Sequence, residues 1–286
     1  MRNFVIVTDS SADLAPETCE ALGIRTVQLQ VLVEGEPAKA NNAVDIQAIY
    51  EQFRAKKNAT TSAVNIDTFL ALFTQILKED VDILYLGFSS GLSSTFSSGR
   101  VALAELAEQY PDRKLYAVDT LCASMGQGLL VYLAAKLKQG GADIDAVRDW
   151  AEDNKLNLVH WFTVDDLFFL KRGGRISAAT AVVGSLLAIK PVMHVDNEGK
   201  LVKVTTARGR RGSIDALFNK MKETMYDTNE TVFISHGDCI ADAEYLAGRI
   251  RNELGISDVQ INYVGPVIGA HSGPGTLALF FLGRER

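Results

Sequence analysis

The sequence predicts an α/β protein with two domains, an N-terminal α/β domain built on a parallel sheet and a second domain of mixed α+β structure. Short apolar runs in the first half alternate with helical stretches, an order typical of parallel strands joined by right-handed crossovers. The 286 residues suit two domains of about 100 to 200 residues each. With 47% hydrophobic and 22% charged residues, the composition is that of a folded globular chain and excludes a disordered one.

The expected first domain, residues 1–157, repeats a unit of strand, polar loop and helix. The first apolar run is Phe4–Val7, and helical spacing follows from Leu14 to Leu22, with Pro16 near the helix start, where proline is tolerated. The unit returns twice, as strand Ile83–Leu86 with helix Ser97–Gln109, and as strand Leu115–Val118 with helical segment Ala123–Lys138. The domain closes with a helix that Asp143 caps and that ends near Asn154.

The expected second domain, residues 158–286, mixes strands and helices without strict alternation. Its predicted elements are strand Val159–Val164, helical stretch Ile176–Ile189, a hairpin at Asp196–Gly199, helix Ile214–Met225, strand Thr231–Ile234, helix Asp242–Leu254, and strands Val259–Val264 and Leu277–Leu282. The stretch 176–189 is apolar almost all round, which predicts a buried core helix or the wall or lid of a cavity.

The net charge and the cysteine content restrict the possible binding partners and the cellular compartment of the protein. A net charge of −6 disfavours nucleic acid as a partner. The three cysteines, Cys19, Cys122 and Cys239, lie far apart and form no disulfide framework, which indicates a reducing, cytoplasmic setting. No uncharged stretch in the second half reaches the roughly 20 residues that a membrane span needs. The four histidines are scattered without a metal-binding spacing, so we expect no metal.

Hydroxyl side chains gather in the loops that follow predicted strands. Such loops converge at the carboxyl edge of a parallel sheet, where neutral donors suit a small anion, a carboxylate in particular. The alternative reading is that these side chains only cap the helices that follow. The group comprises Thr8, Ser10, Ser11, Ser89, Ser90, Ser93, Ser94, Thr95, Thr120 and Ser124, with Thr60, Thr61 and Ser62 in a further loop.

Two other features suggest an anion site. His271 lies in the glycine-rich segment Gly269–Gly275, where the backbone can approach a ligand closely, although a lone histidine is as often a structural hydrogen-bonding residue. Basic residues form two clusters on a protein that is negative overall, and they suit an acidic surface or a phosphate, or else a solvated turn. The clusters are Lys171, Arg172 and Arg175, and Arg208, Arg210 and Arg211.

A serine esterase is an alternative function. Gly87–Gly91 matches the G-x-S-x-G nucleophile elbow with Ser89 as nucleophile, and Asp119 and His271 follow in the order of a triad. Against this reading, the polar segment Ser93–Ser98 separates the serine from its helix, and no oxyanion loop is evident. A regulatory or scaffold module with an empty pocket is a third possibility.

Taken together, the motifs resemble the DegV family of bacterial fatty-acid-binding proteins. The matching segments are Val7–Leu14, Thr61-Ser62, Ser90–Thr95, Ala123–Leu129, Leu170–Ile176, Ile189–Pro191 and Gly265–Gly275. The resemblance implies a cytoplasmic, non-catalytic carrier that holds one long-chain fatty acid, with its carboxylate at the domain interface and its acyl chain in the second domain. It also implies presentation of that carboxylate to a separate kinase, which forms an acyl phosphate for phospholipid synthesis. No cofactor is implied besides the fatty acid.

Carried onto this chain, the resemblance implies specific site residues. The carboxylate would be bound by Thr61 or Ser62, by Ser93 and Ser94, and by His271. The kinase would be met by Arg172, Arg175 and Arg208. If His271 touches the carboxylate, that charge should raise its pKa. The chain departs from the family where TSQPS is common, since it has Thr61–Asn65 (TSAVN), and Ser94 stands where glycine is usual. Both departures bear on acyl preference.

Overall fold

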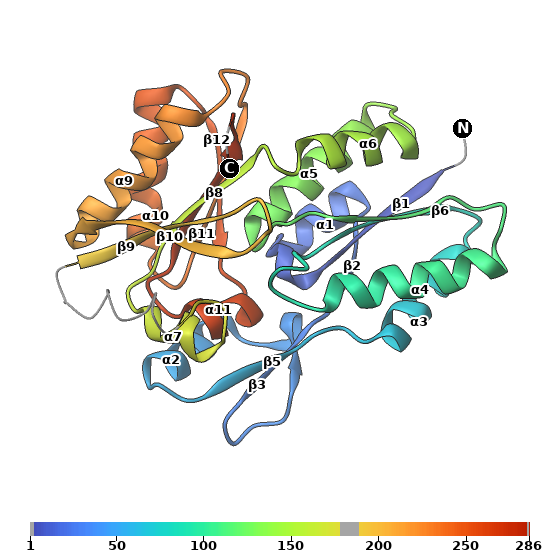
Figure 1. Ribbon diagram of the computed structural model, residues 1–286, viewed down its shortest axis with the longest axis horizontal. Coiled ribbons are helices and arrows are strands. Elements are labelled where there is room, and N and C mark those ends of the chain that lie inside the picture. Colours follow the sequence, from blue (N-terminus) through green and yellow to red (C-terminus); the bar gives the residue numbers. More distant parts are fainter. Residues whose placement is uncertain (1–2, 178–188, 285) are drawn as a thin grey trace.

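The computed structural model describes residues 3–177, 189–284 and 286, which form three sheets and the helices around them (Figure 1). Sheet A has the strand order β2-β1-β6-β7 and is parallel throughout. Sheet B has the order β4-β3-β5 and is antiparallel. Sheet C, with the order β10-β9-β8-β13-β11-β12, is mixed. The expected combination of a parallel-sheet part and a mixed part is confirmed.

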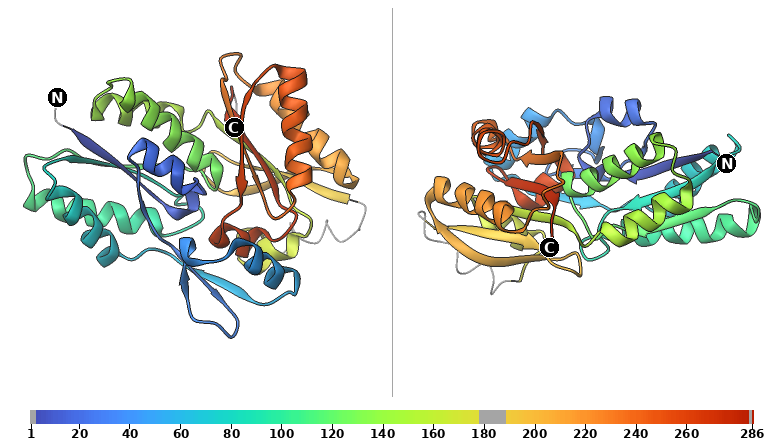
Figure 2. Two further views of the ribbon diagram at one scale, coloured as in Figure 1. Left: turned by 180° about the vertical axis from the view of Figure 1, so that it is seen from behind. Right: turned by 90° about the horizontal axis from the view of Figure 1, so that it is seen from above.

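Sheet A forms the centre of the N-terminal part and is covered on both faces (Figure 2). Its central strand β6 is buried along its whole length, as expected for a parallel strand between helices. Leu84 and Leu86 face one core and Ile83 and Tyr85 face another, which follows the two-residue period of a strand. The strands are β1 (Phe4–Asp9), β2 (Arg25–Val27), β6 (Asp82–Gly87) and β7 (Leu115–Asp119). The helices are α1 (Pro16–Leu22), α5 (Met125–Gln139) and α6 (Ile144–Asn154) on one face, and α3 (Ile66–Leu77) and α4 (Thr95–Gln109) on the other.

Sheet B is an arm that the sequence analysis did not predict. Its members are β3 (Gln30–Val33), β4 (Lys39–Ala40) and β5 (Ala59–Ser62), with α2 (Ile46–Arg54) between the last two. Thr60, Thr61 and Ser62 were expected in a loop, and this expectation is wrong because they form most of β5. A run of polar residues such as this one resembles a loop in the sequence. Its strand character becomes evident only from the pairing with β3, in which Val31 lies opposite Thr61.

Sheet C forms the C-terminal part, with two long helices on its outer face (Figure 1). Its strands are β8 (Leu158–Thr163), β9 (Ile189–Val195), β10 (Leu201–Arg208), β11 (Thr231–His236), β12 (Asp258–Tyr263) and β13 (Leu277–Leu282). The helices are α7 (Leu167–Arg172), α9 (Gly209–Thr224), α10 (Ile240–Arg249), which continues as a π-helix over Ile250–Leu254, and α11 (Pro266–Ser272). The predicted helical stretch 176–189 lies almost wholly in 178–188, outside the described residues.

Helix α5 joins the two parts by packing against both large sheets. Its apolar side chains share one core with Leu84 and Leu86 of sheet A and with Phe233 and Phe280 of sheet C. Near its start, a Cβ on Gly126 would lie 2.1 Å from His160 Nε2, so only glycine fits between helix and sheet. Strands of sheets A and B precede residue 120 and sheet C begins at Leu158. The boundary between residues 157 and 158 stays our proposal.

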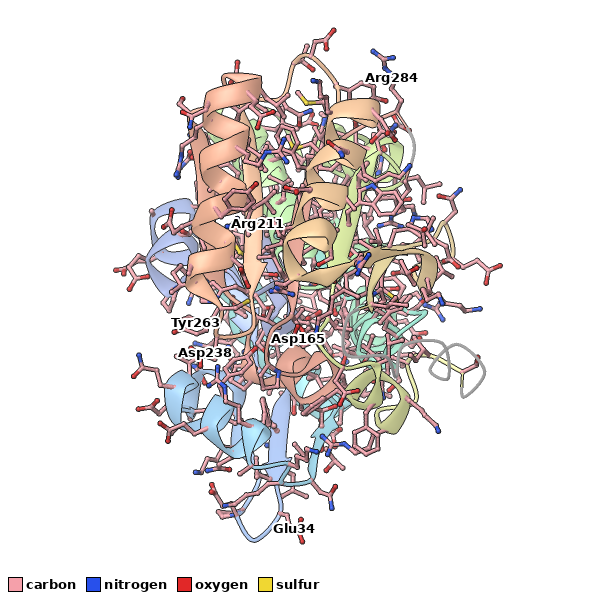
Figure 3. All side chains as sticks on the ribbon, turned by 90° about the vertical axis from the view of Figure 1, so that its left-hand side faces the viewer. Glu34, Asp165, Arg211, Asp238, Tyr263 and Arg284 are labelled. Atoms are coloured by element: carbon pink, nitrogen blue, oxygen red, sulfur yellow. The ribbon has the colours of Figure 1, made fainter. Side chains whose placement is uncertain are left out.

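Polar contacts at the edge of the interface add to this packing. Asp238, after β11, forms an ion pair with Arg54 of α2 and accepts a hydrogen bond of 3.3 Å from the Tyr263 hydroxyl. Figure 3 labels Asp238 and Tyr263, which lie next to each other just above α2. Tyr50 of α2 donates a hydrogen bond of 2.8 Å to the Val264 carbonyl. Among the residues described, no helix is long and apolar enough to cross a bilayer.

The N-terminal core should be sensitive to truncation of Phe73, which is fully buried against Phe69 and Tyr85. Phe73→Ala should lower the free energy of unfolding by about 3 to 5 kcal/mol through lost transfer energy and the cavity left behind. Val101→Ala, at a 42% exposed position of α4, should change it by less than about 0.5 kcal/mol. Urea unfolding followed by circular dichroism measures both, and equal losses would contradict this packing.

Candidate functional site

A cavity of about 320 Å³ lies between the N-terminal and C-terminal parts of the chain. Its walls are mostly apolar and also carry hydroxyl, imidazole and guanidinium side chains. The N-terminal part contributes Leu29, Thr61, Ala63, Phe88, Leu92, Ser93, Ser94, Ala123 and Ser124. The C-terminal part contributes His160, Phe162, Leu170, Arg175, Val195, Leu201, Ser235, Val264, Val267, Ile268, His271, Ser272, Thr276, Ala278 and Phe280. The apolar wall from sheet C arises because Phe162, Ala278 and Phe280 share one face of paired strands.

A hydrogen bond across the cavity joins Thr61 and His271. Thr61 Oγ1 lies 2.8 Å from His271 Nε2, although the two residues are 210 positions apart in sequence. Thr61 is the half-buried residue of β5, and the alternation of the strand turns its neighbour Ser62 outward, where it is exposed and does not line the cavity. The structure therefore brings Thr61 and His271 together and leaves Ser62 out.

Ser93 and Ser94 enter the cavity wall from the loop between β6 and α4. Ser93 Oγ lies 3.0 Å from Thr95 Oγ1 and accepts a hydrogen bond of 3.2 Å from the Thr95 amide. Thr95, the first residue of α4, also accepts a bond of 3.3 Å from the Val64 amide, just beyond β5. Buried Thr95 thus ties the Ser93 loop to the strand that carries Thr61. It was counted among the hydroxyls of the sequence but was not predicted as a site residue.

Helix α11 and the turn after α7 hold the His271 ring. Its Nδ1 is buried and has no hydrogen-bond partner among the described residues. A Cβ on Gly173 would lie 2.2 Å from this Nδ1, so the turn must carry glycine where it crosses the ring. Gly173, in the basic glycine turn, is therefore needed for close packing against His271, and the sequence pattern around the turn did not indicate this role.

The imidazole is neutral near pH 7. Burial, together with the positive charges of Arg175 and Arg172, lowers the pKa of His271 to about 4. The rise in the pKa of His271 that was expected applies only when a carboxylate is bound. Without that charge the protein lowers the pKa of His271. A neutral ring can donate one hydrogen bond and accept another.

Two arginines flank the polar part of the cavity. Arg175 lines the wall and donates to the carbonyl groups of Gly173 and Leu92, the latter at 3.0 Å. Arg172 stacks over the Phe169 ring at 4.9 Å, and its Nε and Nη2 are buried without a partner among the described residues. Neither guanidinium forms an ion pair with a described carboxylate. Their charges attract an anion to this part of the cavity.

Arg208 stands apart from these two. It is exposed at the end of β10, before α9, and does not line the cavity. The structure therefore places Arg172 and Arg175 beside the predicted carboxylate site and Arg208 on the surface.

The geometry does not support the serine-esterase alternative. Ser89 is fully buried, donates a hydrogen bond of 2.8 Å to the Gly199 carbonyl and accepts one of 3.2 Å from the Gly91 amide. His271 is bonded to Thr61 instead, so Ser89 has no base in contact with it among the described residues. Ser89 holds the β9–β10 hairpin against the N-terminal part, and the motif match was a local coincidence.

The other histidines have structural surroundings. His160 Nδ1 lies 3.0 Å from the Leu158 carbonyl and its Nε2 accepts the Ala123 amide at 3.3 Å. His236 Nδ1 accepts the Cys239 amide at 3.2 Å, and His194 stacks on Trp161. The part of the chain that the structure describes contains no cluster of three or more residues able to hold a metal ion.

Comparison with known proteins agrees with these features. A profile described as an uncharacterised protein of the DegV family matches residues 3–284. A DegV domain-containing protein of Clostridium perfringens is 44% identical over 286 residues, covering 99% of this chain and 98% of the relative.

Solved structures give the same result. A DegV family protein from Thermus thermophilus, described as binding fatty acid, superimposes with a TM-score of 0.87 at 29% identity, covering 99% of this chain and all of the other. DegV from Bacillus subtilis, described as a fatty acid binding protein, does so with a TM-score of 0.85 at 27% identity and with the same coverage. The chain therefore belongs to the DegV family.

Proposed function

We propose that the protein binds one long-chain fatty acid, with the acyl chain in the cavity and the carboxylate beside Thr61, Ser93, Ser94 and His271. The observation that carries this proposal is a mostly apolar cavity with a polar part made by the Thr61–His271 pair and flanked by Arg175. The fatty acids described for the relatives from Thermus thermophilus and Bacillus subtilis support the same ligand class.

The acyl chain would supply most of the affinity. Burying about 16 methylene groups contributes roughly 13 kcal/mol before the losses of ligand and association entropy. The head group would set the orientation of the ligand. A carboxylate can leave water at little net cost in free energy only where hydrogen-bond donors of the protein replace its hydration. Thr61 Oγ1 and His271 Nε2 hydrogen-bond to each other in the protein. A bound carboxylate would accept hydrogen bonds from both in place of their mutual bond.

The first test compares Thr61→Val, His271→Ala and Ser62→Ala. Thr61→Val and His271→Ala should each weaken palmitate binding about 10- to 150-fold, the range expected when a hydrogen bond to a charged group is lost. Ser62→Ala, a control on the same strand, should stay within about twofold of the wild type. Calorimetry on delipidated protein measures these constants, and equal effects of all three substitutions would refute the assignment.

Denaturing extraction with mass spectrometry supplies the independent check of stoichiometry. The purified wild type should release about one fatty acid per chain if the cavity holds a single acyl chain. Absence of bound lipid, together with no binding of added palmitate, would exclude the carrier function.

A second test follows the protonation of His271 by NMR. In the lipid-free protein His271 should titrate at about 4, below its unfolded value of 6.5. The stability that this group contributes is therefore present above pH 6.5 and is lost as the pH falls towards 4. Palmitate should raise the pKa of His271, because a nearby negative charge favours the imidazolium. An unchanged titration on loading would contradict contact with the carboxylate.

We further propose that the loaded protein presents its carboxylate to a separate, cytoplasmic ATP-dependent kinase, with Arg172, Arg175 and Arg208 facing that partner. In this reaction a carboxylate oxygen attacks the γ-phosphorus of ATP, the bond between that phosphorus and the bridging oxygen breaks, and ADP leaves. The acyl phosphate would serve phospholipid synthesis. The absence of ion pairs from Arg172 and Arg175 to described carboxylates supports a role toward an external anion or acidic surface.

Charge reversal at Arg208 tests the docking. Because Arg208 lies outside the cavity, Arg208→Glu should leave the palmitate dissociation constant unchanged and slow acyl phosphate formation about tenfold at limiting carrier concentration. Arg100→Glu, on exposed α4, is the matched control. A bacterial fatty acid kinase catalytic subunit with ATP and loaded carrier provides the assay. Equal rates for both variants would remove Arg208 from the interface.

A further inference from the structure

We infer that Asp13, Ser124 and Ser235 form an interdomain latch in the wall of the cavity, and that opening this latch controls the exchange of the bound ligand. The part of this inference that concerns exchange rests on the proposed fatty-acid binding. The part that concerns the latch rests on contacts in the protein alone. The function proposed above makes no use of these three residues.

The latch is a chain of hydrogen bonds through buried side chains. Ser124 Oγ, at the start of α5, donates a bond of 2.6 Å to Asp13 Oδ2 in the loop after β1. The same Oγ lies 3.1 Å from Ser235 Oγ on β11, so this bond crosses from the N-terminal to the C-terminal part. Asp13, Ser124 and Ser235 are 7%, 6% and 0% exposed. Their burial limits competition from bulk water for these bonds while the parts stay together.

The backbone around Asp13 is bound to the C-terminal part as well. Asn262 Nδ2, on β12, donates a bond of 2.8 Å to the Asp13 carbonyl. A Cβ on Gly265 would lie 2.3 Å from Asp13 Oδ1, so the next loop passes directly over the carboxyl group. Through Asp13 the loop after β1 therefore contacts β12 and Gly265, the residue before α11, and it reaches β11 only by way of Ser124.

The local conformation indicates that the surrounding structure forces this contact. Asp13 has φ 51° in the left-handed region, which aspartate adopts more readily than most residues, whereas Ser124 has φ 53° with ψ −148°, values that are rare outside glycine. Such conformations persist only where the neighbouring contacts hold them, and they are common at switch regions. Separation of the two parts would remove those contacts at both residues together.

The latch separates two cavities. Ser124 and Ser235 line the cavity of about 320 Å³, together with Val264 and Val267. Asp13 and Asn262 line a second cavity of about 490 Å³ on the other side. Opening the latch would therefore open the wall of the first cavity towards the second.

Protonation of Asp13 should set the strength of the latch. Burial raises the pKa of Asp13 to about 7, and the negative charge of Asp9 adds to this rise, while the Ser124 hydroxyl and the Gly265 amide oppose it. The titratable groups that line the second cavity together with Asp13 are Asp9, Cys19, Glu20 and Tyr263, and Tyr50 of α2 also interacts with the Asp13 charge. No described Lys, Arg or His lines that cavity.

The sign of the pH effect follows from linkage. The closed state binds the Asp13 proton more tightly than an open, hydrated state, whose carboxyl has a pKa near 3.8. The contribution of Asp13 to closure is therefore full below pH 3.8 and is lost as the pH rises through about 7. A more alkaline medium should loosen the latch.

The first experiment measures release of cis-parinaric acid from the full-length protein by stopped-flow fluorescence, with excess albumin as acceptor. The wild-type dissociation rate should rise about threefold or more between pH 6 and 8, and Asp13→Asn should flatten this rise. Ser235→Ala should release the probe about 3- to 10-fold faster than the wild type at pH 6. Ser213→Ala, a buried serine of α9 bonded to the Arg210 carbonyl, is the matched control and should behave as the wild type.

A second experiment needs no ligand. Urea unfolding of Asp13→Asn, Ser235→Ala and the double variant gives a double-mutant cycle. If the latch exists, the effect of the double variant on the unfolding equilibrium constant should differ from the product of the two single effects by about threefold or more. Additive effects, or equal release rates for Ser235→Ala and Ser213→Ala, would overturn the latch. Failure of the wild type to bind the probe would count against the proposed function, and the cycle would then decide the latch alone.

Discussion

The hydrogen bond between Thr61 Oγ1 and His271 Nε2 constrains much of this structure. It is 2.8 Å long and joins a strand of sheet B to a short helix of the C-terminal part. Each group needs a partner, because a buried hydroxyl or imidazole without one loses its hydration without compensation. The ring also has to fit beneath the Gly173 turn, so the positions of β5, α7 and α11 depend on one another. A carboxylate that replaces this bond would meet donors already held in place.

The fold brings these elements together through helix α5 and two tight contacts. Helix α5 shares its core with both large sheets, which keeps the apolar wall of sheet C opposite the loops of sheet A. Ser89 holds the β9–β10 hairpin through the Gly199 carbonyl, and Thr95 ties the Ser93 loop to the residues after β5. Polar side chains from the two parts thus line a mostly apolar cavity, and the neutral His271 avoids a buried charge until a ligand supplies the counterion.

The sequence allowed prediction where local pattern determines structure. Strands β1, β6 and β7 of sheet A and the helices after them follow from apolar runs and polar loops, whereas the edge strand β2 was not predicted. His271 and Ser93 follow from the family motifs. Sheet B was not predicted, because β4 has only two residues and β5 is mostly polar. The choice between Thr61 and Ser62 depends on the strand alternation of β5, which is visible only when β5 is known to pair with β3. Gly173 and Asp13 act through contacts that no spacing in the chain reveals.

A crystal structure of the protein loaded with palmitate tests the central claim most directly. We expect one carboxylate oxygen within hydrogen-bonding distance of both Thr61 Oγ1 and His271 Nε2, with the acyl chain along Phe162 and Phe280 on the inner face of sheet C. A carboxylate bound elsewhere, with the bond between Thr61 and His271 intact, would contradict it.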